Sequence, residues 1–335
     1  MTAPNSASRK TALVTGAAGF IGSHLVEYLL TAGWRVRGID DFSAGTLENL
    51  RGPLLSPDFE FTEGSVLDER LTRSVAAGAT HIFHLAGRVG AMYVEQNPEQ
   101  TVLDAIRATQ TMLAVVDDTR VPLFFASTSE IYGDSDRLPL AEDADIIIAP
   151  PANPRSSYAF AKGVGELLVN EYARRTGGPV VIGRLFNTIG PRQSGQYGLV
   201  VPRFIGWARD NQPITIHGDG KQTRSFSAVA DVVRAIVATL TTSAAYGQTI
   251  NIGSDQETSV SDLAALVIRL TGSSSTVRHE PYDHVHGRGA RDIRRRVPDT
   301  TRLRRLVGGA CATPLETVIR TIVEAPVETS VGGSV

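Results

Sequence analysis

The sequence predicts an α/β fold: a Rossmann-like, doubly wound parallel sheet with a smaller, interleaved C-terminal lobe. Over the first half of the chain, short apolar runs alternate with segments of helical spacing, as they do where helices cover both faces of a parallel sheet. The glycine-rich turn TGAAGFIGSH (15–24) directly follows the first of these runs. From about residue 187 the composition changes to glycine-rich loops and short segments, which predicts the second, smaller lobe.

The elements of the predicted sheet follow one another in regular order. Gly33 follows the first helical segment, near whose end a C-cap glycine is common. The proline-rich stretch IIIAPPANPRSS (146–157) interrupts the pattern and predicts a loop before the next helix. The expected strands are 11–15, 35–40, 59–64, 81–87, 122–128 and 180–186, and the expected helices are 20–31, 99–117 and 158–175.

The later part of the chain leaves the sheet and returns to it. A helix at 202–210 and a strand at 213–217 are expected between loops, followed by a helix in SAVADVVRAIVATL (227–240) and a strand at 248–254. The lobe is therefore interleaved with the end of the main domain. The expected boundaries are a disordered tail at 1–10, a main domain formed by 11–186 and about 225–255, a lobe formed by 187–224 and about 256–325, and a flexible tail at 326–335.

The composition is that of an ordinary soluble globular protein. The chain of 335 residues has a net charge of −2, so no basic excess points to nucleic acid as a partner. Its single cysteine, Cys311, excludes an intrachain disulfide and suits the reducing cytoplasm, where we expect the protein to lie. The polar first ten residues lack the apolar core of a signal peptide, and no apolar run is long enough to cross a membrane.

The glycine-rich turn has the spacing of a dinucleotide site. Gly16, Gly19 and Gly22 lie between a predicted strand and a predicted helix, where missing side chains let backbone N–H groups approach a pyrophosphate. Asp40 ends the second strand, where a carboxylate accepts from an adenosine ribose hydroxyl, and Asp41 follows it. No arginine is close by in sequence to receive a 2′-phosphate, so the residues at the end of the second strand favour NAD over NADP. The alternative interpretation is an Asp–Asp pair that caps a turn.

Tyr158 and Lys162 form the predicted centre of the chemistry. They are four residues apart in a predicted helix and so share a face. An ammonium beside a phenol is expected to lower the tyrosine pKa from near 10 toward neutrality, which makes the tyrosine a general base. The chain has only three lysines, Lys10, Lys162 and Lys221. The presence of one of them at position 162 favours a role as a compact hydrogen-bond donor to a ribose. The broad, planar guanidinium of arginine would fill that role poorly.

The segment ASTSEIYGD (126–134) follows the apolar strand residues 122–125 and places polar side chains at the carboxyl edge of the sheet. Ser127 and Thr128 offer hydroxyls there, and Glu130 offers a carboxylate. The alternative interpretation is a cap for the next segment. The pairs His81–His84 and His284–His286 have no supporting cysteine or carboxylate spacing, so we expect no metal site.

Taken together, TGAAGFIGSH, HLAG, STSEIYG, YAFAK, RLFNTIGPRQ and GDGKQTRSF resemble the extended short-chain dehydrogenase/reductases, NAD-dependent epimerases and dehydratases of nucleotide sugars, over about residues 11–305. The resemblance implies NAD recycled within each turnover, a nucleoside-diphosphate sugar as substrate, and a homodimer formed through two helices of the Rossmann domain. The cofactor residues that it implies are Gly16, Gly19, Phe20, Ile21, Gly22, Asp40, Asp41, Phe42, Ser43, Gly45, Gly64, Ser65, Leu85, Ala86, Gly87, Ser127, Tyr158 and Lys162.

Within this family the chain is most similar to UDP-glucuronate decarboxylases. That similarity implies oxidation at C4 of the sugar, loss of CO2 from C5, and then reduction to UDP-xylose or release of UDP-4-keto-xylose. Its catalytic residues would be Thr128, Glu130, Tyr158, Lys162 and Arg224, with Arg224 either near C5 or a diphosphate ligand only. The substrate-binding residues that it implies are Arg88, Tyr93, Asn187, Arg192, Val200, His217, Arg224 and Arg296.

Two other functions stay open from the residues. One is a nucleotide-sugar 4-epimerase or 4,6-dehydratase, because Glu130 also suits a base at C5. The other is a catalytically silent NAD-binding regulator, against which the intact Tyr158–Lys162 pair argues.

Overall fold

A seven-stranded parallel sheet forms the centre of the computed structural model, which describes residues 9–87, 91–148, 156–195, 199–282, 284, 292–309 and 311–325. The strand order is β11-β6-β5-β4-β1-β2-β3, and every neighbouring pair is parallel. The strands are β1 (Thr11–Thr15), β2 (Arg35–Asp40), β3 (Phe59–Glu63), β4 (His81–His84), β5 (Leu123–Thr128), β6 (Val180–Leu185) and β11 (Gln248–Ile252). The order reverses between β1 and β4, so a crevice opens there at the carboxyl ends of the strands.

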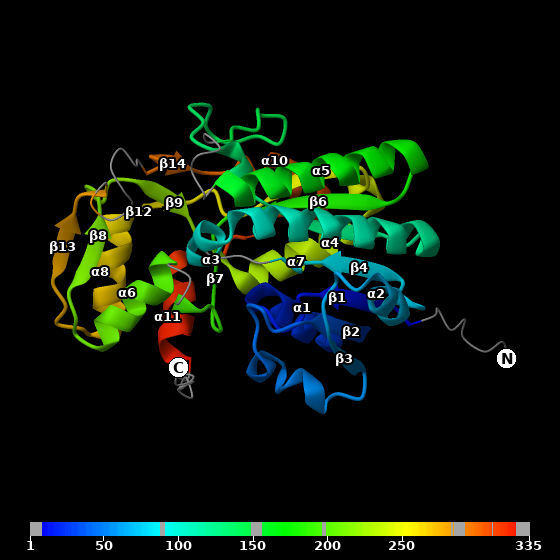
Figure 1. Ribbon diagram of the computed structural model, residues 1–335. Helices are drawn as coiled ribbons and strands as arrows, with labels where there is room; N and C mark the ends of the chain where they lie inside the picture. The colour runs from blue at the N-terminus through cyan, green and yellow to red at the C-terminus, as the bar shows by residue number, and fades with distance from the viewer. Residues whose placement is uncertain are drawn as a thin grey trace.

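Helices cover both faces of the sheet, as predicted (Figure 1). Successive side chains of a strand point to opposite faces, and in β1 Ala12 and Val14 pack on one side while Leu13 packs on the other. The first face carries α1 (Phe20–Thr31), α7 (Val229–Leu240) and α10 (Thr301–Val307). The second carries α2 (Glu69–Ala76), α4 (Pro98–Thr119) and α5 (Ser156–Thr176). The short helix α3 (Ala91–Gln96) precedes α4.

The smaller lobe has its own core between three helices and short strands. Phe204, Leu263 and Ile319 are buried in it, one from each of α6 (Val200–Arg209), α8 (Val260–Thr271) and α11 (Leu315–Glu324). Two small sheets flank the helices: β8 (Ile214–His217) pairs with β13 (Val277–Glu280), and β9 (Thr223–Ser225) lies between β12 (Glu257–Ser259) and β14 (Arg295–Arg296). The pair β7 (Thr188–Ile189) and β10 (Ser227–Ala228) lies where the chain passes between the two parts.

Three observations refine the expected boundaries. The strand predicted at 81–87 ends at His84, because the next three residues leave the sheet and line the crevice. Helix α10 falls in the stretch assigned to the lobe, yet Leu303 is buried in the core of the main sheet. Arg9, placed in the disordered tail, pairs with both carboxylate oxygens of Asp58 at 2.6 Å, and Lys10 stacks on Trp34. Residues 1–8 and 326–335, the rest of the two expected tails, lie outside the described residues.

Across the part of the chain that the structure describes, none of the helices combines the length and the apolar character needed to cross a membrane.

Candidate functional site

A cleft of about 2250 Å³ lies at the carboxyl ends of the sheet strands and continues beneath the smaller lobe. Both parts of the molecule contribute to its wall, which is where the strand order predicts a ligand site. The predicted residues that line it are Gly16, Gly19, Phe20, Ile21, Gly22, Asp40, Asp41, Phe42, Ser43, Gly45, Gly64, Ser65, Leu85, Ala86, Gly87, Ser127, Thr128, Glu130, Tyr158, Lys162, Asn187, Arg192 and Arg296.

The glycine-rich turn is built so that only glycine fits at two of its positions. Gly16 has a φ of +71°, and a Cβ there would lie 2.9 Å from the backbone nitrogen of Ala86. A Cβ on Gly22 would lie 1.9 Å from the carbonyl oxygen of Gly16. The turn therefore packs backbone against backbone, and its own N–H groups at residues 16–19 donate to protein oxygens. The first N–H groups of α1, which have no acceptor within the helix, are the ones that a pyrophosphate of a dinucleotide would use.

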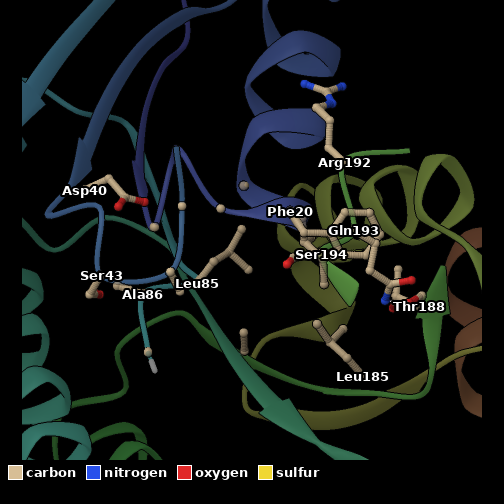
Figure 2. Close-up of a pocket in the computed structure, with 18 of the residues that line it drawn as sticks. Phe20, Asp40, Ser43, Leu85, Ala86, Leu185, Thr188, Arg192, Gln193 and Ser194 are labelled. Carbon is tan, nitrogen blue, oxygen red and sulfur yellow. Dashed lines mark hydrogen bonds between the residues drawn. The ribbon is translucent and has the colours of Figure 1, made fainter. Parts of the chain in front are cut away.

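The carboxylate of Asp40 stands beside this turn (Figure 2). Its two oxygens accept from the backbone N–H groups of Ala18, at 3.0 Å, and Phe42, at 2.8 Å. Burial raises the pKa of Asp40, although both N–H groups act in the opposite direction. Each carboxylate oxygen keeps a further lone pair for a ribose hydroxyl, whereas a 2′-phosphate would be repelled. The geometry thus fits NAD, the cofactor that the sequence predicts.

Tyr158 and Lys162 lie one turn apart on α5 and both face the cleft. The Nζ of Lys162 donates to the carbonyl oxygen of Ala126 at 2.8 Å, and burial lowers the pKa of this lysine to about 8. Tyr158 is hydrogen-bonded to the Thr128 hydroxyl. Burial, assisted by the charge of Glu130, raises the pKa of Tyr158 above 10. The expectation that Lys162 brings this pKa toward neutrality is therefore wrong for the protein by itself, because desolvation of the phenol dominates.

Glu130 and Arg296 form the other polar end of this centre. Glu130 belongs to the turn η3 (Ser129–Tyr132), which Thr128 caps by accepting from the Glu130 N–H at 3.2 Å. Nη1 of Arg296 lies 4.0 Å from a carboxylate oxygen of Glu130. The Nε of Arg296 is buried and finds no hydrogen-bond partner among the residues that the structure describes. A buried, unsatisfied N–H of a guanidinium is costly, and it is a ready donor to an anionic ligand.

Arg224 is the strand neighbour of Arg296, because the two residues pair between β9 and β14. Its guanidinium is already engaged: it donates to the carboxylate of Asp292 at 2.6 Å and to the carbonyl oxygen of Ile293 at 2.7 Å. Arg224 does not line the cleft, although the sequence suggested a catalytic role for it. Of the two arginines, Arg296 is the one presented to the centre.

Ser127 connects the cleft to a buried polar network. Its hydroxyl donates to Glu166 at 2.5 Å, and Glu166 also accepts from Nε and Nη2 of Arg184, the residue opposite Ser127 on β6. Arg184 also donates to the hydroxyl of Tyr132, which donates to Asn251 on β11. Sequence reasoning missed this network, although Glu166 lies four residues beyond Lys162 on the same helix face.

The remaining predicted substrate residues differ in where they lie relative to the cleft. Tyr93, Val200 and His217 are described but lie outside the wall of the cleft, and Arg88 lies outside the described residues. Arg192 lines the cleft, but its guanidinium is directed along α1 (Figure 2). Gln193 and Thr188, which also line the cleft, were not predicted, although both belong to the segment RLFNTIGPRQ (184–193) that carries the resemblance.

Comparison with known proteins agrees with this geometry. The model of the NAD dependent epimerase/dehydratase family matches residues 12–253. The UDP-N-acetyl-alpha-D-glucosaminuronate decarboxylase of Bacillus cytotoxicus is 36% identical over 299 residues, which cover 89% of this chain and 92% of the relative. UDP-glucuronic acid decarboxylase 1 of Xenopus tropicalis is 32% identical over 310 residues, 92% of this chain and 70% of the relative.

Among solved structures, UDP-glucuronic acid 4-epimerase from Bacillus cereus, in complex with UDP-glucuronic acid and NAD, has a TM-score of 0.82 at 29% identity. The match covers 93% of this chain and 98% of that one. The glycine cradle, the acid that ends β2 and the Tyr158–Lys162 pair are all in place for such an enzyme. The chain therefore belongs to the NAD-dependent epimerase/dehydratase family, as its resemblance to extended short-chain dehydrogenase/reductases predicts, and NAD is its cofactor.

Proposed function

We propose that this protein is a UDP-glucuronate decarboxylase, which forms UDP-xylose or releases UDP-4-keto-xylose. The observation that carries the proposal is the arrangement of Arg296 and Glu130 beside the Tyr158–Thr128 hydrogen bond. The residues of the oxidation step, Tyr158 and Lys162, therefore lie next to Arg296, a buried cation with an unused N–H. A substrate with a carboxylate at C5 would give that N–H its partner.

The first chemical step falls to Tyr158 and Lys162. NAD held at the glycine-rich turn and Asp40 would supply the acceptor for the hydride from C4 of the sugar and the donor that returns it. Tyr158 accepts the proton of the C4 hydroxyl, and Thr128 keeps the phenol oriented. The positive charge of Lys162, held on the Ala126 carbonyl, favours the phenolate as it forms. Because the pKa of Tyr158 is raised in the protein alone, the phenol has to release its own proton to water as it takes up the proton of the C4 hydroxyl, and hydride loss accompanies this transfer.

The second step breaks a carbon–carbon bond. With a ketone at C4, the C5 carboxylate is a β-keto acid, and the electron pair of the C5–C6 bond moves into a C4–C5 enolate as CO2 leaves. Tyr158 and Thr128 donate hydrogen bonds to the enolate oxygen, which lowers the energy of that charge. We propose that Arg296 binds the carboxylate and that Glu130 holds the water that protonates C5. Arg224, whose charge is paired with Asp292, supports the strand that carries Arg296.

The relatives support this class of reaction and add one alternative substrate. Both sequence relatives described above are named decarboxylases of UDP-uronates, and the Bacillus cytotoxicus relative is named for the 2-acetamido sugar. UDP-N-acetylglucosaminuronate is therefore our second candidate. The Bacillus cereus structure is named as a 4-epimerase of UDP-glucuronic acid, so isomerisation without loss of CO2 is the alternative outcome.

A direct assay tests the proposal. The NAD-loaded protein is incubated separately with UDP-glucuronate and with UDP-N-acetylglucosaminuronate, and the sugars are followed by NMR and mass spectrometry. We expect a product lighter by CO2 from UDP-glucuronate. Recovery of both uronates unchanged, or as C4 epimers only, would rule out the decarboxylase. The variant Arg296→Gln should lose about 10- to 100-fold in kcat/KM for UDP-glucuronate, the range expected for one lost hydrogen bond to a charged group.

We also propose that two copies of the chain pair through α4 and α5. These helices pack side by side, and their outer surface leaves Leu103, Phe160 and Leu167 exposed to solvent. Residues 160 and 167 are seven apart in α5 and so share a face. Large apolar side chains at one helix face suit a partner, and the same two helices of a second copy would cover them.

A further inference from the structure

Contacts with helix α1 and the residues near it account for the position of the Arg192 side chain without a bound substrate. Nη1 and Nη2 of Arg192 donate to the two carboxylate oxygens of Glu27, at 3.1 and 2.6 Å. Nη1 also donates to the backbone carbonyl of Asn49, at 3.1 Å. Such a bidentate pair between an arginine and a carboxylate is among the stronger polar contacts in proteins. It joins segments that are 165 residues apart in the sequence.

His24, one turn before Glu27 on α1, completes the contact. Its Nε2 lies 3.0 Å from the carbonyl oxygen of Pro191, an acceptor, so Nε2 carries the proton. Nδ1 therefore presents a lone pair, and it accepts from Nη2 of Arg192 at 2.9 Å. Burial and the charge of Arg192 both lower the pKa of His24, which agrees with a neutral ring. We refer to Arg192, Glu27 and His24 as the clamp.

The clamp leaves Arg192 little capacity for a ligand. Glu27, Asn49 and His24 together take up the four N–H groups of Nη1 and Nη2, of the five that a guanidinium has. The backbone of Arg192 is also in the left-handed region, with a φ of +68°, which costs about 1 kcal/mol for a residue with a side chain. The surrounding contacts hold it there.

The clamp joins the two walls of the cleft. Helix α1 begins at the glycine-rich turn, which forms the cofactor wall. Arg192 belongs to the loop at 190–195, whose neighbouring Gln193 lines the opposite wall and donates to the Thr188 carbonyl at 2.8 Å. Glu27 and His24 are three residues apart and so lie on one face of α1, the face turned to this loop. Without the clamp, side-chain contacts that fix the loop on α1 would be lost.

We propose that Arg192 is a positioning residue that acts through Glu27 and His24, fixing the loop at 190–195 on the cofactor helix and thereby shaping the nucleotide half of the substrate site. The inference rests on the proposed function only in taking a nucleoside diphosphate as part of the ligand. It differs from direct binding of the diphosphate by Arg192, the role that the family resemblance implies.

A double-mutant cycle separates the two roles. The dissociation constant of UDP is measured by calorimetry on NAD-loaded protein for the wild type, Glu27→Gln, Arg192→Gln and the double variant. We expect each single variant to weaken UDP binding by about 10-fold, and the double variant to be no weaker than either. Arg192→Lys should not restore binding, because an ammonium cannot make the paired contact. Arg269→Gln, which breaks the exposed bidentate pair with Glu316 in the lobe, is the matched control and should bind UDP normally.

Any other pattern overturns the proposal. A large loss in Arg192→Gln with normal binding in Glu27→Gln would mean that Arg192 contacts the diphosphate itself. Normal binding in both would mean that the clamp does not shape the site. Because the ligand is UDP alone, neither result depends on whether the enzyme decarboxylates a uronate, so a failure here is distinct from a failure of the proposed function.

Discussion

Lys162 shows how one buried charge can serve a reaction without ionising its neighbour beforehand. It is buried beneath the cleft, and its ammonium lies 5.3 Å above the ring of Phe125 and is fixed on the Ala126 carbonyl. Tyr158 stays a phenol in the protein alone because burial and the charge of Glu130 raise its pKa. The lysine therefore acts on the transition state, in which the proton of the sugar hydroxyl is partly transferred, more than on the resting enzyme.

Substituting Lys162→Arg should keep the fold and slow C4 oxidation by about 100-fold or more. The guanidinium is larger and planar, so it cannot occupy the same buried position on the Ala126 carbonyl. The measurement is the transient NADH absorbance after mixing with nucleotide sugar, with thermal unfolding as the check on the fold. Lys221→Arg, at an exposed lysine, is the control and should behave as the wild type. Normal NADH formation in Lys162→Arg would contradict this role.

The residue-level roles could be named from the sequence only in part. From the spacing alone, Tyr158, Lys162 and the glycines could be placed at one edge of the sheet, because the carboxyl ends of parallel strands lie at the same edge. The direction of the Tyr158 pKa shift was missed, since burial depends on the whole packed structure. The ion pairs of Arg192 and Arg224 could not be predicted for the same reason, because their carboxylate partners, Glu27 and Asp292, are not near them in any local pattern.

At the scale of elements, α5 has two different faces. One carries Tyr158 and Lys162 toward the cleft and Glu166 toward β6, while the other exposes Phe160 and Leu167. The strands and helices of the sheet could be predicted because their hydrophobic periods are regular. Helix α10 could not be assigned to the sheet, because nothing in its seven residues tells which core receives Leu303.

The exposed face of α5 makes the homodimer testable. Leu167, 67% exposed, is the most exposed of the three apolar residues on α4 and α5. Leu167→Glu should leave the monomer fold intact and shift the protein from dimer to monomer, since it would bring a charge into each copy of the interface. Light scattering after gel filtration gives the mass. Leu55→Glu, at an 86% exposed leucine outside these helices, should leave the mass unchanged. A monomeric wild-type protein would refute the proposal.

For the molecule as a whole, the buried His84 contributes to the response to acid. Burial lowers the pKa of His84 to about 3, and its Nδ1 is hydrogen-bonded to the Thr15 hydroxyl at 2.9 Å. The unfolded chain binds this proton near pH 6.5 and the folded protein near pH 3. The contribution to stability is therefore complete above about pH 6.5 and is lost as the pH falls below it.

Between pH 7.5 and 5.0 this single group should cost about 2 kcal/mol of unfolding free energy, at about 1.4 kcal/mol per pH unit below 6.5. Urea unfolding at both pH values measures it. A variant His84→Asn cannot take up this proton, so its loss between the two pH values should be smaller by about that amount, whatever its stability at pH 7.5. An equal loss in both proteins would mean that His84 is protonated in the folded state.

The place of β11 in the sheet has a consequence for synthesis of the protein. Strand β6 ends at Leu185, but its neighbour β11 begins at Gln248, after the first half of the lobe. While the ribosome makes the segment between them, the emerging domain has an open edge, because the backbone groups of β6 on the side away from β5 have no strand to pair with. The nascent chain is thus most prone to wrong pairing during that interval, and completion of the sheet waits for a strand that follows much of another lobe.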